Sequence, residues 1–84
     1  MPSSILVVED EPAIAELIAV NLQHAGHYPI RAYNAEQALS LMSDVLPDVV
    51  LLDLTMPGMD GLEVCQRIRK RNTSLPIVML TARG

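Results

Sequence analysis

Four short segments of the chain have the hydrophobic pattern of β-strands. Three of them contain an uninterrupted run of four apolar residues, which is typical of strands buried on both faces of a parallel sheet. The fourth segment alternates more, and Pro29 within it favours an edge position, because proline cannot donate a hydrogen bond to a neighbouring strand. The pattern predicts strands over residues 4–9, 28–33, 47–53 and 76–81.

Between these strands, apolar residues recur every three or four positions, which predicts three helices. The first helix begins at Pro12 and stops at Gly26. Its apolar face is formed by residues at helical spacing, Ile14, Leu17, Ile18, Leu22 and Ala25. The other two begin after Asn34 and Asp60, each followed three positions later by Gln or Glu, as in a capping box. Strands that alternate with helices predict right-handed crossovers and an α/β fold with a parallel sheet.

Polar residues stand where three of the predicted strands end. Glu9 and Asp10 end the first strand, Asp53 ends the third, and Thr81 ends the fourth. Because loops at the carboxyl ends of parallel strands converge on one crevice, we expect these side chains to meet. Carboxylates that lie close together repel each other, and a hard divalent cation such as Mg²⁺ removes that repulsion. The pattern therefore favours a Mg²⁺ site at this edge.

Each of these residues also has a purely structural interpretation. Asp10 or Glu11 could cap the first helix, and Thr81 could be an ordinary hydroxyl at the end of a strand. Asp53 is harder to explain in this way, because Asp60 already supplies the cap of the next helix. On the pattern alone, a metal site and a structural role both remain open.

A bound cation would let an anionic phosphoryl donor approach this acidic edge. An aspartate oxygen could then attack phosphorus in line, as in other enzymes that form an aspartyl phosphate. Thr81 could hydrogen-bond a phosphoryl oxygen once it is attached.

The amino-acid composition disfavours several classes of function. The chain has 84 residues, half of them apolar, which is enough for one small folded domain. Its net charge of −4, its two tyrosines and its lack of phenylalanine and tryptophan disfavour nucleic-acid binding by this segment. The single cysteine, Cys65, excludes an intramolecular disulfide and is expected to be a small apolar helix residue. We see no membrane span and no export signal, and therefore expect a cytoplasmic location.

Three motifs, in this order along the chain, resemble the receiver domain of two-component response regulators. They are Ile5-Leu6-Val7-Val8-Glu9-Asp10-Glu11-Pro12, Asp53 with Met56-Pro57-Gly58-Met59-Asp60-Gly61, and Met79-Leu80-Thr81-Ala82-Arg83-Gly84. The last is most similar to receivers that precede a winged-helix DNA-binding domain. The resemblance implies a flavodoxin-like sheet, here in the order 2-1-3-4.

The resemblance also implies a role for each site residue. Asp53 would accept a phosphoryl group from a sensor histidine kinase or from a small acyl-phosphate donor. Asp10, Asp53 and the backbone carbonyl of Thr55 would bind Mg²⁺, and Glu9 would assist through water. Thr81 would move toward the phosphoryl group as the activation switch.

The chain departs from the family pattern after its fourth strand. The family's fifth strand ends in a lysine that contacts the phosphoryl group, whereas the only lysine here is Lys70, on the third helix. We therefore expect an incomplete receiver, residues 1–84, without the fifth strand and the last two helices. This would leave an apolar edge at the fourth strand and uncover Ala13, Leu17 and Val20 of the first helix, a surface that could form a homo-oligomer.

These expectations favour a phosphorylation-controlled switch of an output domain, with transcription as the expected output. The receiver would be a phosphoacceptor that assists its own phosphorylation and not an enzyme. One alternative is a phosphorylation-independent docking or dimerisation module on the same fold. A phosphatase with an aspartate nucleophile would need a second acid at the position of Thr55 and is disfavoured.

Overall fold

The computed structural model describes residues 2–53 and 60–80. Strands and helices alternate in the order β1 (Ser4–Val8), α1 (Pro12–His24), β2 (Tyr28–Ala32), α2 (Ala35–Asp44), β3 (Val49–Asp53), α3 (Gly61–Arg71) and β4 (Ile77–Leu80). Every predicted strand and helix is present, and the strands are one or two residues shorter than the sequence pattern predicts. No helix in the described part of the chain is long and apolar enough to cross a membrane.

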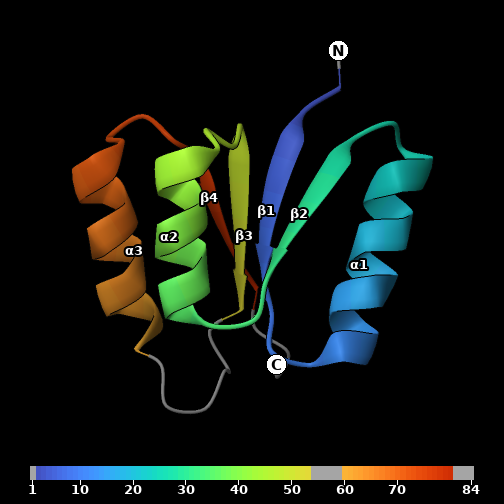
Figure 1. Ribbon diagram of the computed structural model, residues 1–84, viewed down its shortest axis with the longest axis horizontal. Helices are drawn as coiled ribbons and strands as arrows, with labels where there is room; N and C mark the ends of the chain where they lie inside the picture. Colours follow the sequence, from blue (N-terminus) through green and yellow to red (C-terminus); the bar gives the residue numbers. More distant parts are fainter. Residues whose placement is uncertain (1, 54–59, 81–84) are drawn as a thin grey trace.

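All strand pairs are parallel, and the sheet has the order β2-β1-β3-β4, which confirms the predicted order (Figure 1). The edge position of β2 agrees with Pro29 inside that strand. Along β1 and β3, Val8 pairs with Leu52, so the two strands end side by side. This register determines which residues meet at the carboxyl edge of the sheet.

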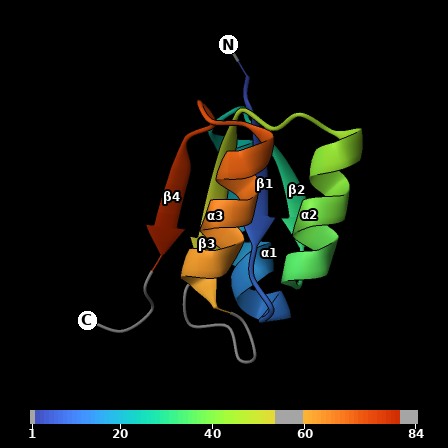
Figure 2. The same cartoon turned by 90° about the vertical axis from the view of Figure 1, so that its left-hand side faces the viewer.

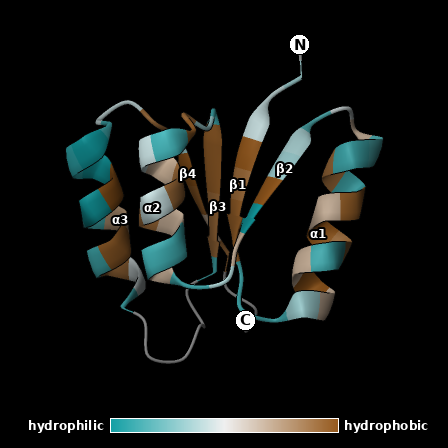
Figure 3. Cartoon of the chain, in the orientation of Figure 1, coloured by the Kyte–Doolittle hydropathy of each residue, from teal (hydrophilic) through white to brown (hydrophobic). Residues whose placement is uncertain are grey.

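The helices cover the two faces of the sheet unequally. α1 lies against one face, whereas α2 and α3 lie side by side on the other (Figures 1 and 2). The main hydrophobic core lies between the sheet and α2 and α3. It is formed by Leu6, Val8, Ala32, Ala38, Met42, Val50, Leu52, Val64, Ile68 and Leu75. Figure 3 shows that β1, β3 and β4 in the middle are mostly apolar, whereas β2 is more polar and the helices alternate polar and apolar segments.

The α1 helix contacts the sheet through small residues. Ala15 and Ala19 are buried, whereas Ile14 is exposed and Leu17 has an exposed fraction of 63%. Ile14 and Leu17, which helical spacing assigns to the apolar face of this helix, are thus exposed, and the buried stripe runs through the alanines. The expectation that Leu17 is uncovered is confirmed.

β4 is less buried than its apolar sequence predicts. Val78 and Met79 are exposed, and Ile77 and Leu80 are half-buried. In the described part of the chain β4 pairs with β3 on one side, at the edge of the sheet beyond α3 (Figure 2). The expectation of a strand buried on both faces is thus wrong here, while that of an apolar edge is confirmed. Self-association through this edge stays a prediction.

The starts of α2 and α3 show the N-cap half of the predicted capping box. The Asn34 side chain accepts a hydrogen bond from the Gln37 backbone N–H at 2.8 Å. Asp60 Oδ1 accepts from the N–H groups of Leu62 and Glu63, at 3.0 and 3.3 Å. Because Asp60 is used as a cap, it is not a candidate for the acidic cluster at the strand ends.

The arginines in the second half of α3 make ion pairs and hydrogen bonds within the fold. Arg67 pairs with Glu63 at 3.2 Å, and Arg69 donates to the Leu75 carbonyl. Arg71 donates to the Leu39 carbonyl at 2.8 Å and thereby joins α3 to α2. These contacts involve the three arginines, and the negative end of the helix dipole also favours basic residues here, so no anion site is needed to explain them.

Candidate functional site

The register of the sheet brings the acidic residues together. Glu9 follows β1 directly, and its backbone N–H donates to the Ala32 carbonyl at 3.0 Å, which continues the pairing of β1 with β2. Asp53 is the last residue of β3 and pairs with Leu80 of β4. Since β1 and β3 end side by side, Glu9 and Asp53 are neighbours at the carboxyl edge of the sheet.

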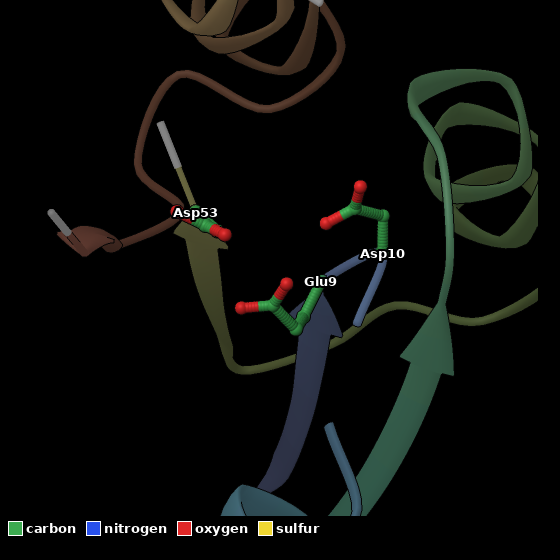
Figure 4. Close-up of side chains that lie close together, drawn as sticks. All are labelled: Glu9, Asp10 and Asp53. Atoms are coloured by element: carbon green, nitrogen blue, oxygen red, sulfur yellow. The ribbon is translucent and has the colours of Figure 1, made fainter. Parts of the chain in front are cut away.

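Three carboxylates share one small space at this edge. Glu9, Asp10 and Asp53 each offer one oxygen atom, and these atoms all lie within 4.8 Å of one another. Figure 4 shows the three side chains turned toward the same space from the ends of β1 and β3. Glu9 and Asp53 are each only 4% exposed, and Asp10 is half-buried. The predicted convergence of these three acids is therefore observed.

The crowding changes the acidity of Glu9. Burial raises the pKa of its carboxyl group from an ordinary value of 4.5 to about 7, and the neighbouring Asp53 adds to the increase. The backbone N–H of Glu11 opposes this shift by hydrogen-bonding the carboxylate.

A hard divalent cation would favour the ionised form of the Glu9 carboxyl group. Mg²⁺ is usually held by one or two carboxylates together with waters and phosphate oxygens, and the carboxylates gathered here can supply those protein ligands, so the residues present fit this ion.

The alternative interpretation of Asp10 and Glu11 as helix caps is not supported. Glu11 occupies the N-cap position of α1, but its side chain makes no capping hydrogen bond. Glu11 contributes a different group that the sequence analysis missed, namely its backbone N–H, which binds Glu9 Oε2 at 3.0 Å. Pro12 indicates where the helix begins. Nothing in the sequence indicates that the Glu9 side chain turns back to accept a hydrogen bond from the Glu11 N–H.

The other two predicted site residues, Thr55 and Thr81, lie outside the described residues, so their roles stay predictions. Lys70 lies exposed on α3, which begins with Gly61 after the N-cap Asp60.

We expect the metal-free protein to become less stable as the pH rises. Between about pH 4.5 and 7, folded Glu9 retains a proton that the unfolded chain has lost, so the stability contribution of Glu9 is complete below pH 4.5 and disappears through pH 7. Denaturant unfolding in EDTA at several pH values measures this effect against Glu9→Gln, which cannot titrate. A difference between the two proteins that stays constant over this pH range would contradict the shift.

Comparison with known proteins identifies the family to which this chain is similar. The family model of the response regulator receiver domain matches residues 5–84. The "Probable transcriptional regulator ycf27" of Guillardia theta is 44% identical over 80 residues, which cover 95% of this chain and 31% of that protein. The chain thus spans about a third of the length of this curated relative.

Solved structures give the same result. The response regulator TrrA of Thermotoga maritima, in complex with Mg²⁺-BeF, is 44% identical with a TM-score of 0.90, over 98% of this chain and 71% of that one. TrrA has also been solved in complex with the histidine kinase ThkA, with a TM-score of 0.89. The chemotaxis protein CheY4 of Vibrio cholerae is 29% identical with a TM-score of 0.93, over 100% of this chain and 72% of that one. With this fold, this acidic edge and these matches, the chain belongs to the response regulator receiver domain family of two-component signalling.

Proposed function

We propose that Asp53 accepts a phosphoryl group from a sensor histidine kinase, in a reaction that requires Mg²⁺, and that this switches a transcriptional output. The observation that carries the proposal is the convergence of Glu9, Asp10 and Asp53 within 4.8 Å at the carboxyl edge of the sheet. A receiver in this role is an acceptor that assists its own modification and does not turn over other substrates.

The roles divide among the three acids. Asp10 and Asp53 would hold Mg²⁺, helped by Glu9 through water and by the Thr55 carbonyl. When bound, the ion neutralises the pocket and so permits an anionic donor to enter. A carboxylate oxygen of Asp53 then forms a bond to phosphorus while the bond from phosphorus to the donor nitrogen or oxygen breaks, and the electron pair leaves with the donor. Thr81 would contact the phosphoryl group afterwards.

Similar proteins support three parts of this proposal, namely the metal ion, the kinase partner and the transcriptional output. TrrA has been solved with Mg²⁺-BeF and with the histidine kinase ThkA, which favours a metal and a kinase partner here. The name of the ycf27 relative favours a transcriptional output through a separate domain. A cytoplasmic location agrees with these partners.

The docking alternative is favoured by one observation. Ile14 and Leu17 of α1 and Val78 and Met79 of β4 leave apolar side chains exposed, which is a common property of contact surfaces. A docking module of this kind needs neither a cation nor a phosphoryl donor.

Phosphoryl transfer from acetyl phosphate separates these functions. We expect intact-protein mass spectrometry to show one added phosphoryl group after incubation with acetyl phosphate and Mg²⁺, and almost none when EDTA replaces Mg²⁺. No adduct in either condition would favour the docking module. An adduct that forms equally well in EDTA would contradict the metal requirement.

A further inference from the structure

Asp10 lies in a bend whose two neighbouring residues are both held in place. On one side, the Glu9 N–H donates to the Ala32 carbonyl at 3.0 Å. On the other side, the Glu11 carbonyl accepts from the Ala15 N–H at 2.9 Å in the first turn of α1. The bend is closed by the Glu9 side chain, whose Oε2 accepts from the Glu11 N–H at 3.0 Å.

The closing hydrogen bond is well placed to restrict the bend. Glu9 is only 4% exposed, so water competes little for its carboxyl oxygens. Because the side chain of Glu11 adds no cap, the Glu9 carboxylate is the side chain that ties the bend to the start of α1.

Restriction of this bend matters for the metal site. Asp10 is the most exposed of the three acids and belongs to the loop, whereas Asp53 is fixed by strand pairing. A ligand on a mobile loop loses conformational freedom when it binds an ion, and a loop that is already fixed loses less. The affinity for Mg²⁺ should therefore depend on how firmly the bend holds Asp10.

We propose that Glu9 is a positioning residue, which fixes the backbone that presents Asp10 by accepting the Glu11 N–H, in addition to any charge that it contributes to the pocket. This inference rests on the proposed function, because it concerns the same metal site. It differs from a role as a ligand, since the hydrogen bond exists in the metal-free protein and needs an acceptor oxygen but no negative charge.

A pair of neutral variants separates the hydrogen bond from the charge. Glu9→Gln and Glu9→Met both remove the charge and keep a similar side-chain size, but only Gln retains an acceptor oxygen for the Glu11 N–H. A neutral side chain at this buried position should be tolerated, because replacing a buried charge by a well-packed neutral group is often neutral or stabilising.

Amide hydrogen exchange and Mg²⁺ titration give independent readouts. In metal-free protein we expect the Glu11 amide to exchange roughly tenfold faster in Glu9→Met than in Glu9→Gln, as about 1.4 kcal/mol of hydrogen-bond energy would produce. Calorimetry with MgCl₂ should show binding roughly tenfold weaker in Glu9→Met than in Glu9→Gln.

Each outcome decides one of the two claims. Equal Glu11 exchange, or equal Mg²⁺ affinity, in the Gln and Met variants would overturn the positioning role. If the two variants differ as expected while acetyl phosphate leaves wild type unmodified, the positioning role stands and the proposed function fails. If wild type is phosphorylated but the variants behave alike, only the positioning role fails.

Discussion

Replacing Asp10 by alanine is expected to weaken Mg²⁺ binding by roughly a hundredfold or more. This exceeds the loss of about 10- to 100-fold that follows when a residue merely supports a ligand, because in the proposed site Asp10 would bind the ion with one of its own oxygens. In wild type, Mg²⁺ at about 100 times its dissociation constant should stabilise the fold by about 2.7 kcal/mol. The variant should show almost none of this stabilisation at the same concentration.

Thermal melting with and without MgCl₂ measures this difference. Asp44→Ala is the matched control, because it removes the same charge from an exposed position at the end of α2, away from the strand ends. The control should respond to Mg²⁺ as wild type does. An unchanged response in the Asp10 variant would remove Asp10 from the metal site.

Replacing Leu52 by alanine is expected to lower the free energy of unfolding by about 3 kcal/mol. Leu52 is fully buried in the core between the sheet and α2 and α3, next to the site residue Asp53. The loss combines the transfer of the removed methyl groups with the cavity that they leave. For a small domain this is a large part of the total stability, so the variant should be partly unfolded at room temperature.

Urea unfolding followed by circular dichroism tests this expectation. Leu46→Ala is a matched control, since Leu46 is 80% exposed and its loss should change the free energy of unfolding by about 0.5 kcal/mol or less. Similar midpoints for the two variants would show that Leu52 does not support the core as described.

The strands and the acidic edge could be predicted from the sequence because they follow from simple periodicity. Three apolar runs and one alternating segment define the strands, and residues that follow parallel strands share an edge of the sheet. For this reason the sequence pattern by itself predicts that Glu9, Asp10 and Asp53 converge, as they do in the structure. The order in which the strands pair needed the resemblance.

Other features depend on packing that periodicity does not encode. Helical spacing shows that Ile14 and Leu17 share the apolar side of α1, but it does not show that Ala15 and Ala19 face the sheet. The hydrogen bond from the Glu11 backbone to Glu9 belongs to a bend whose shape depends on main-chain geometry and not on side-chain type. It could be found only in three dimensions.

The central claim is that Asp53 is the phosphoryl acceptor of a Mg²⁺-dependent site. The most direct measurement is the intact mass of wild type, Asp53→Asn and the matched variant Asp44→Asn after incubation with acetyl phosphate and Mg²⁺. We expect one added phosphoryl group on wild type and on Asp44→Asn, and only background on Asp53→Asn. An adduct of equal yield on Asp53→Asn would show that another residue accepts the phosphoryl group.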